Sequence, residues 1–253
     1  MTDTPRYEQT ETNEYGQAVG LCPKAWQAPA PVQSAALTQH LQGQYCHLQP
    51  LESKHAPELL AAFDQASPSL WTYLPYGPFQ SLEDYENWIS DLNRDIDNCF
   101  AYCIKSRETD QVLGLSAYLR MQPEAGSIEI GHLSFSPLLQ QTRAATEAIF
   151  MMIDAVFMLG YRRCEWKCND LNIPSIAAAG RFGFRFEGTF RQAMVVKGRN
   201  RNTAWFSILD YEWETLRPCY ENWLAPENFT KSGRQKTRLS DMTQLITQGR
   251  VPE

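Results

Sequence analysis

The stretch Ile128–Gly188 decides the fold. It reads IEIGHLSFS (128–136), PLLQQTRAATEAIFMMIDAVFMLG (137–160), YRRCEWKC (161–168), NDLNIPSIAAAGRFGF (169–184) and RFEG (185–188). Its hydrophobic pattern predicts a strand, a long helix, a strand, a short helix and a strand, in that order. The long helix, from about 142 to 159, is apolar except for a solvent-facing stripe of Arg143, Glu147 and Asp154. So narrow a stripe predicts a helix that packs on a sheet and is covered by a second layer.

A strand, a helix and a strand in this order form a right-handed parallel crossover. The short helix that follows has clear boundary signals, with Asn172 as N-cap, Pro174 in the first turn and Gly183 at the end. Alternating segments on both sides predict antiparallel strands at 100–106, 112–121, 128–135, 185–196 and 203–211, the last two around a turn at 197–202. The expected fold class is therefore α/β (α+β), with a mixed, mostly antiparallel sheet, one parallel crossover and helices on both faces.

The rest of the chain divides into an arm, a domain and a tail. Residues 1–44 are polar and interrupted by prolines, which predicts an N-terminal arm. The domain is expected to span 45–224 and the C-terminal tail 225–253. Further elements are predicted as a strand at 45–51 and helices at 56–65, 81–96, 212–224 and 240–247.

Composition and charge are those of an ordinary globular protein. Hydrophobic residues make up 43% and charged residues 21% of the 253 residues. The formal net charge of -6 argues against a general nucleic-acid-binding protein. The seven cysteines are scattered and the N-terminal sequence has no apolar signal core, so we expect a reducing, cytoplasmic setting. The most apolar segment, Ala148–Leu159, is too short for a membrane span and contains Asp154.

Two pairs of cysteines, Cys164 with Cys168 and Cys99 with Cys103, have the same spacing on predicted strands. At that spacing two residues share a face of the strand but lie roughly 13 Å apart, too far for one metal ion or one disulfide. We therefore expect no metal site and interpret these cysteines as small buried residues.

Three short motifs stand in order along the chain: T-E-A at 146–148, N-x-x-S at 172–175 and G-F-x-x-E-G at 183–188. With the order of the elements, they resemble the GNAT acetyltransferases over about 43–215, most closely the ribosomal-protein alanine acetyltransferase-like branch (RimJ/RimL type). The resemblance implies acetyl-CoA as donor and a primary amine as acceptor, in a small molecule or at a peptide or protein N-terminus. The alternative is a coenzyme-binding or regulatory module of this fold without turnover. The oligomeric state is left open, with a homodimer as one possibility. Neither nucleic acid nor membrane is an expected partner.

The loop before the long helix is the expected coenzyme site, because a helix N-terminus binds pyrophosphate through its free N–H groups and its dipole. The family's loop reads Gln/Arg-x-x-Gly-x-Gly/Ala, whereas this chain reads QQTRAAT over 140–146. Alanine is small enough to let the coenzyme approach the loop backbone closely, but backbone angles that only glycine adopts are not expected there. The resemblance implies coenzyme contacts for Phe135, Ser136, Gln141, Thr142, Arg143, Ala144, Ala145, Thr146, Asn172 and Ser175.

Acetyl transfer to an amine needs a base for the amine and an acid for the thiolate. The resemblance implies Glu129 as the base, often through water, and Ser175 as the acid. His132 is a rival base. A purely structural role would make Glu129 a paired strand residue, Asn172 an N-cap and Ser175 a first-turn hydroxyl bonded to backbone. The branch also carries a second carboxylate at a position where this chain has Met194.

The segment 71–79 holds four aromatic residues, two prolines and a glycine, which excludes regular structure. It stands where the family forms its acceptor pocket, and packing of a long loop is the equal alternative. The turn with Lys197, Arg199 and Arg201 could attract an acidic acceptor or the coenzyme's 3′-phosphate, although such a run is usually a solvated turn. The resemblance implies substrate contacts for Trp71, Tyr73, Tyr76 and Phe79.

Overall fold

The computed structural model describes residues 8–23, 26–29, 32, 37, 40–95 and 98–247. Its centre is a seven-stranded sheet in the order β3-β4-β5-β6-β7-β9-β8. β6 and β7 are parallel, and the other neighbours in this sheet are antiparallel. The predicted architecture is therefore confirmed. The strands are β3 (Cys46–Pro50), β4 (Cys99–Ser106), β5 (Val112–Gln122), β6 (Ser127–Phe135), β7 (Arg163–Asn169), β8 (Arg185–Val196) and β9 (Arg199–Leu209).

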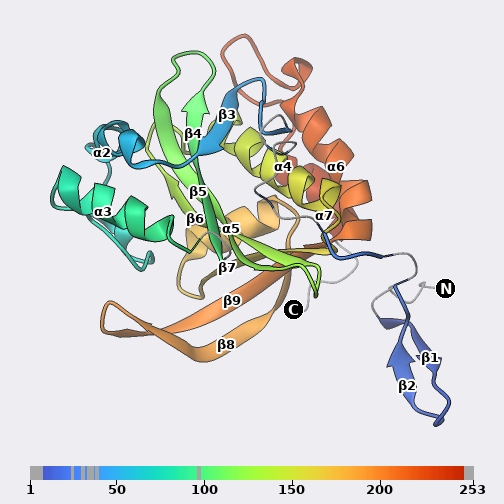
Figure 1. The fold of residues 1–253 in the computed structure, drawn as a ribbon. Helices are drawn as coiled ribbons and strands as arrows, with labels where there is room; N and C mark the ends of the chain where they lie inside the picture. Colours follow the sequence, from blue (N-terminus) through green and yellow to red (C-terminus); the bar gives the residue numbers. More distant parts are fainter. Residues whose placement is uncertain are drawn as a thin grey trace.

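Helices cover both faces of the sheet (Figure 1). They are α2 (Ala56–Phe63), α3 (Leu82–Leu92), α4 (Arg143–Met158), α5 (Ile173–Arg181), α6 (Asp210–Leu224) and α7 (Leu239–Thr247), with short 3-10 helices η2 (Ser53–His55), η3 (Pro68–Trp71) and η4 (Pro226–Asn228). Alternation along β4 explains the two layers, because successive side chains of a strand point to opposite faces. Tyr102 and Ile104 pack in one apolar cluster with α4 and α6, while Ala101 and Cys103 pack in another with α2 and α3.

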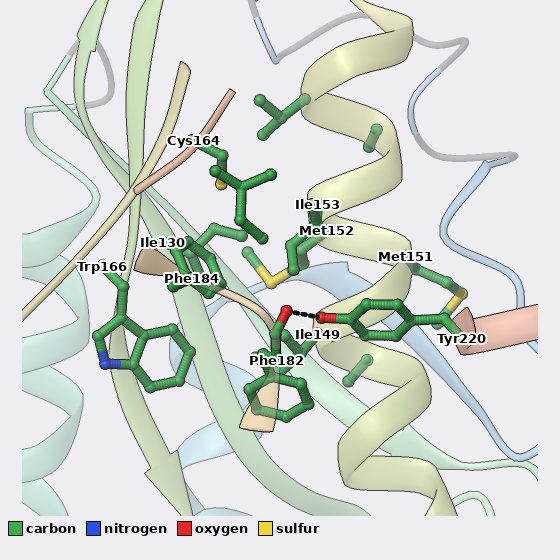
Figure 2. Packing of buried hydrophobic residues seen from close by; sticks show 14 of the residues in the cluster. Ile130, Ile149, Met151, Met152, Ile153, Cys164, Trp166, Phe182, Phe184 and Tyr220 are labelled. Atoms are coloured by element: carbon green, nitrogen blue, oxygen red, sulfur yellow. Dashed lines mark hydrogen bonds between the residues drawn. The ribbon is translucent and has the colours of Figure 1, made fainter. Parts of the chain in front are cut away.

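The long helix α4 lies between the sheet and α6, so the predicted second layer is present. Phe150 stacks on Tyr220 with ring centroids 5.5 Å apart. The Tyr220 hydroxyl donates to the carbonyl of Phe182 at 2.6 Å, which ties α6 to the end of α5 (Figure 2). One expectation was wrong: the polar stripe does not face solvent, because Glu147 and Asp154 are only 5% and 8% exposed.

Asp154 shows how this stripe can be buried. Its carboxylate accepts hydrogen bonds from the Trp213 indole at 3.0 Å and the Arg217 guanidinium at 2.8 Å, and His40 Nε2 lies 3.2 Å away. Burial raises the pKa of Asp154, but the hydrogen bonds from His40, Trp213 and Arg217 outweigh burial and lower it to about 2. The fold therefore stabilises the ionised carboxylate.

We expect Asp154→Asn to lower the free energy of unfolding by about 2 kcal/mol near pH 7, since a pKa lowered from 3.8 to about 2 is worth about 1.36 kcal/mol per unit. A depressed carboxyl pKa stabilises the fold above the unfolded value, and this contribution is lost as the pH falls from about 4 to about 2. The difference between parent and variant is expected to shrink over that window. Urea unfolding across it checks this, and a constant difference would contradict it.

Two element boundaries differ most from the prediction. α3 ends earlier than expected, because Asn93 donates from its side chain to the carbonyl of Leu51 at 2.8 Å and the chain turns there. The predicted last residue of this helix, Ile96, lies outside the described residues. The closing hairpin turns at Lys197 and Gly198, which both have positive φ, so β9 begins earlier than the predicted strand.

The N-terminal arm contains a separate hairpin. Its strands are β1 (Thr10–Thr12) and β2 (Ala18–Gly20), and the hairpin projects away from the sheet (Figure 1). Residues 1–7 of the predicted arm and 248–253 of the predicted tail lie outside the described residues. In the part of the chain that is described, no helix has the length and hydrophobicity to cross a bilayer.

Candidate active site

The sheet opens where its two parallel strands separate. β6 and β7 pair through 127–129 and 163–165, and beyond these residues the two strands diverge. A cavity of about 550 Å³ occupies the opening, and its walls include β6 residues from Glu129 to Phe135, β7 residues 166–169 and the start of α5. Strands that separate leave backbone N–H and C=O groups without a ladder partner. The opening can therefore bind an extended molecule that carries amide groups.

Glu129 lies where the strands separate, and it is 2% exposed. Its Oε2 lies 2.5 Å from Arg120 Nη2 and 3.1 Å from Lys167 Nζ. Its Oε1 accepts no hydrogen bond within the described part of the chain. The residue is thus paired, as its structural alternative predicts, yet it lines the cavity rather than the outer surface. One oxygen is held by two cations, and the other has no donor among the described residues.

His132, the rival base, lines the same cavity. Burial, together with the charge of Arg120, lowers its pKa from 6.5 to about 4. It therefore loses the titration near neutral pH that makes histidine a common base, and it brings no negative charge to attract an ammonium group. Its ring packs against Tyr76 with centroids 5.2 Å apart. Charge and burial thus distinguish His132 from Glu129.

Asn172 and Ser175 stand at the start of α5, and both line the cavity. Asn172 is the N-cap, and its Oδ1 accepts a hydrogen bond from the Ser175 N–H at 3.2 Å. The Ser175 hydroxyl accepts a bond from the Trp166 indole N–H at 3.0 Å rather than bonding to backbone. This bond uses a lone pair of the oxygen, and the hydroxyl is also a hydrogen-bond partner of the Cys168 side chain.

The loop before α4 forms a capped helix N-terminus without glycine. The Thr142 hydroxyl accepts a hydrogen bond from the Ala145 N–H at 3.1 Å. Gln141 has φ of 60°, a left-handed angle that residues other than glycine adopt only uncommonly. Arg143 points elsewhere, with its guanidinium carbon 3.9 Å from the centroid of the Phe229 ring. The loop therefore offers backbone N–H groups to an anion, rather than the charge of Arg143.

The family profile described as "Acetyltransferase (GNAT) domain" matches residues 46–185, more than half of the chain. This chain belongs to the GNAT acetyltransferase family. It is an N-acetyltransferase, and enzymes of this family use acetyl-CoA.

Individual relatives agree with this assignment. The crystal structure of a GCN5-related N-acetyltransferase from Brucella melitensis is 41% identical with a TM-score of 0.82, over 87% of this chain and 99% of that chain. The "Uncharacterized N-acetyltransferase p20" of Bacillus licheniformis is 30% identical over 153 residues, 58% of this chain and 84% of that protein. RimL, the ribosomal L7/L12 alpha-N-protein acetyltransferase, is 18% identical with a TM-score of 0.59, over 66% of this chain and 91% of that chain, and it shares the fold.

In this acetyltransferase the aromatic segment 71–79 packs both within itself and against aromatic residues of α3. Trp71 contacts Phe79 edge to face at 5.5 Å, and Phe79 stacks on Tyr85 at 4.2 Å. Tyr76 stacks on Phe79 at 6.2 Å between ring centroids. Tyr73 is the one member of the four predicted substrate contacts that lines the cavity. The other three do not line it.

Lys197 ties the β8–β9 hairpin to the aromatic segment. Its Nζ donates to the carbonyl oxygens of Trp71 at 2.8 Å, Tyr76 at 3.0 Å and Gly77 at 2.7 Å. Lys197 is exposed, as expected for a solvated turn, but its ammonium group is also held by these three carbonyls. These three hydrogen bonds hold the β8–β9 hairpin beside the aromatic segment, and both contribute residues to the cavity wall.

Three residues of the site were missed from the sequence: Arg120, Lys167 and Trp166. Lys167 carried a signal, because it alternates with apolar residues in a strand predicted to lie inside the sheet. A lysine there needs a buried partner, and it has Glu129 and Glu165. The sequence around Arg120 carried no such signal.

Proposed function

We propose that this acetyltransferase moves the acetyl group of acetyl-CoA directly to a primary amine of a small molecule or of a peptide or protein N-terminus. The proposed catalytic domain is 45–224. The observation that supports it is the cavity between the diverging strands, which has Glu129 in one wall and Ser175 in another. A proton acceptor and a proton donor around one cavity are what amine acetylation requires.

The opening fits acetyl-CoA, which supplies the acetyl group as a thioester. The free edges of β6 and β7 suit its amide-bearing arm, with Asn172 beside that arm. The N-terminus of α4 suits its pyrophosphate. Ser136 precedes this helix and has a buried hydroxyl without a hydrogen-bond partner among the described residues. We assign Phe135, Ser136 and 141–146 to this end of the site, with the role of Arg143 limited to its backbone.

Glu129 and Ser175 carry the proton transfers in this proposal. Oε1 of Glu129 accepts the amine proton, directly or through water, as the amine nitrogen bonds to the acetyl carbon. Ser175 donates its hydroxyl proton to the sulfur as the carbon–sulfur bond breaks, and it regains a proton from solvent. Backbone N–H groups at the irregular register of β6 near Gly131 polarise the carbonyl.

Binding and turnover test the proposal separately. Calorimetry and thermal shift with acetyl-CoA measure binding. Thiol release is then measured with alkyl amines, amino acids and peptides. We expect saturable binding and thiol release that depends on the amine. No heat and no thermal shift at saturating acetyl-CoA would refute the proposal.

A coenzyme-binding module without turnover is the second candidate, and Met194 favours it. Met194 lines the cavity, in the segment where the resembling branch has a carboxylate, and a thioether cannot take up the amine proton. Binding of acetyl-CoA without thiol release from any amine would support this candidate. The closer placement in the ribosomal-protein acetyltransferase branch is also a proposal, and peptides with N-terminal alanine or serine test it.

We expect Glu129→Gln to lower kcat/KM about tenfold near pH 7 for an α-amine acceptor. An α-amino group with a pKa of about 7.7–8.0 is already about one-tenth neutral there, so a base can raise the reactive fraction about tenfold. The loss is expected to shrink towards about pH 9, where the amine is neutral without help. The pH profiles of parent and variant check this. If His132→Asn changed the pH profile and Glu129→Gln did not, the base would be His132 instead of Glu129.

A further inference from the structure

Among the described residues, one cation in the cavity wall has no counter-ion. Arg201 on β9 lines the cavity together with Arg120, Lys167 and Glu129. Arg120 and Lys167 both contact Glu129, and Lys167 also contacts Glu165. Arg201 forms no ion pair with any described residue, and its Nε is buried without a hydrogen-bond partner there. The wall therefore carries one positive charge that the fold does not neutralise.

Leaving a guanidinium in this state is unfavourable, because a desolvated charge needs a partner. Desolvation lowers the pKa of Arg201, but a guanidinium does not lose its proton in proteins. The fold nevertheless holds the residue in place, since Arg201 pairs with Met194 across the β8–β9 ladder. An anion that enters the cavity would satisfy this charge.

Arg201 lines the same cavity as Glu129, and the charges around it indicate its neighbours there. The groups whose charges act on it are Cys168, Glu129 and Arg120. The phosphate end is the N-terminus of α4, which follows Phe135 at the other end of β6. At strand rise, roughly 20 Å separate Glu129 from Phe135. The pyrophosphate is therefore assigned away from Glu129, the carboxylate whose charge acts on Arg201.

We propose that the acceptor is a primary amine with a carboxylate close to the amine, and that Arg201 binds this carboxylate while Glu129 faces the amine. The inference rests on the proposed function and names its substrate class. The negative charge of Glu129 complements the amine of such an acceptor, and the positive charge of Arg201 complements its carboxylate. A guanidinium binds a carboxylate through two parallel hydrogen bonds, which also fixes the direction of the amine.

Pairs of acceptors that differ in a single carboxylate test the proposal. One pair is an amino acid and its amide, and the other is a peptide with aspartate or asparagine after its first residue. We expect the parent enzyme to prefer the carboxylate member of a pair by about 10–100-fold in kcat/KM, from the strength of a charged hydrogen bond. Arg201→Gln is expected to lose this preference.

Arg199→Gln is the matched control, because Arg199 lies on the same strand and is exposed. It is expected to keep the preference of the parent. Arg201→Glu is a second variant, expected to prefer the neutral member. Thermal melting of each variant shows that it is folded. The pair that shows the preference identifies the source of the carboxylate, a free amino acid or an acidic peptide.

Three results would overturn the proposal. Equal losses for both members of a pair in Arg201→Gln would mean that Arg201 only supports the wall. A weaker affinity of this variant for acetyl-CoA would assign Arg201 to the coenzyme phosphates. A parent enzyme without a preference would also overturn it, while leaving acetyl transfer intact. Failure of the proposed function is different, since no coenzyme binding or no thiol release would be seen with any amine.

Discussion

Ser175→Ala is expected to lower kcat about 100-fold while the affinity for acetyl-CoA stays within about threefold. The Ser175 hydroxyl accepts its hydrogen bond from Trp166 at 3.0 Å, and in the proposed mechanism its proton turns from the Cys168 side chain to the departing sulfur. A thiol with a pKa of about 8.5 is a fair leaving group even without an acid, so the loss falls at the low end of the range for acid catalysis. Single-turnover thiol release and calorimetry measure the two quantities.

Two further variants separate proton donation from packing. Ser175→Thr keeps a hydroxyl in the first turn of α5 and is expected to retain kcat within about tenfold of the parent. Trp166→Phe removes the indole N–H that orients the Ser175 hydroxyl, and an intermediate loss in kcat is expected with unchanged coenzyme affinity. A parent-like kcat for Ser175→Ala would end the assignment of Ser175 as the acid and would leave the fold untouched.

The start of α5 could be predicted from sequence because its chemistry is local. Asn172 caps the helix, and its side-chain oxygen accepts a hydrogen bond from the N–H of Ser175. Pro174 is tolerated because it lies in the first turn. These contacts span only a few residues, so the spacing alone places Ser175 at the helix start. The parallel crossover was predictable for a similar reason, since the order of strand, helix and strand restricts the topology.

The partners of Glu129 could not be predicted, because they depend on strand register. Arg120 has φ of 46° and lies where the pairing of β5 with β6 is irregular, between Leu119 and Gln122. Such an irregularity redirects side chains that simple alternation would place elsewhere. The hydrogen bond from Lys197 to the carbonyl of Trp71 joins positions 126 residues apart. Hydrophobic pattern carries no information on contacts of that range.

The polar stripe of α4 shows a second limit of pattern reading. A periodicity of polar residues indicates which side chains share a face, and it does not say whether water or buried donors satisfy them. Glu147 was interpreted as solvent-facing, yet it lies beneath the turn that leads into β3. The backbone of that turn can donate to Glu147 only because Gly43 has no Cβ, which would otherwise collide with the carboxylate.

Glu147→Ala is expected to lower the free energy of unfolding by about 3–4 kcal/mol. The carboxylate accepts backbone N–H bonds from Gln44 at 2.7 Å, Tyr45 at 2.6 Å and Cys46 at 2.8 Å. Alanine leaves these three donors without their acceptor, and each unsatisfied buried donor costs about 1–3 kcal/mol. Water can reach the outermost donor, at Gln44, because that residue is exposed. The full sum of three such losses is therefore not expected.

Urea unfolding of a small series measures this effect. Glu147→Gln keeps one acceptor oxygen but points an NH2 group at backbone donors, so about half of the loss is expected. Glu214→Ala removes an exposed glutamate from α6 and is expected to change stability by less than about 0.5 kcal/mol. Glu147 does not line the cavity, so the folded variants are expected to bind acetyl-CoA like the parent. An unchanged unfolding midpoint for Glu147→Ala would mean that these buried bonds do not stabilise the fold.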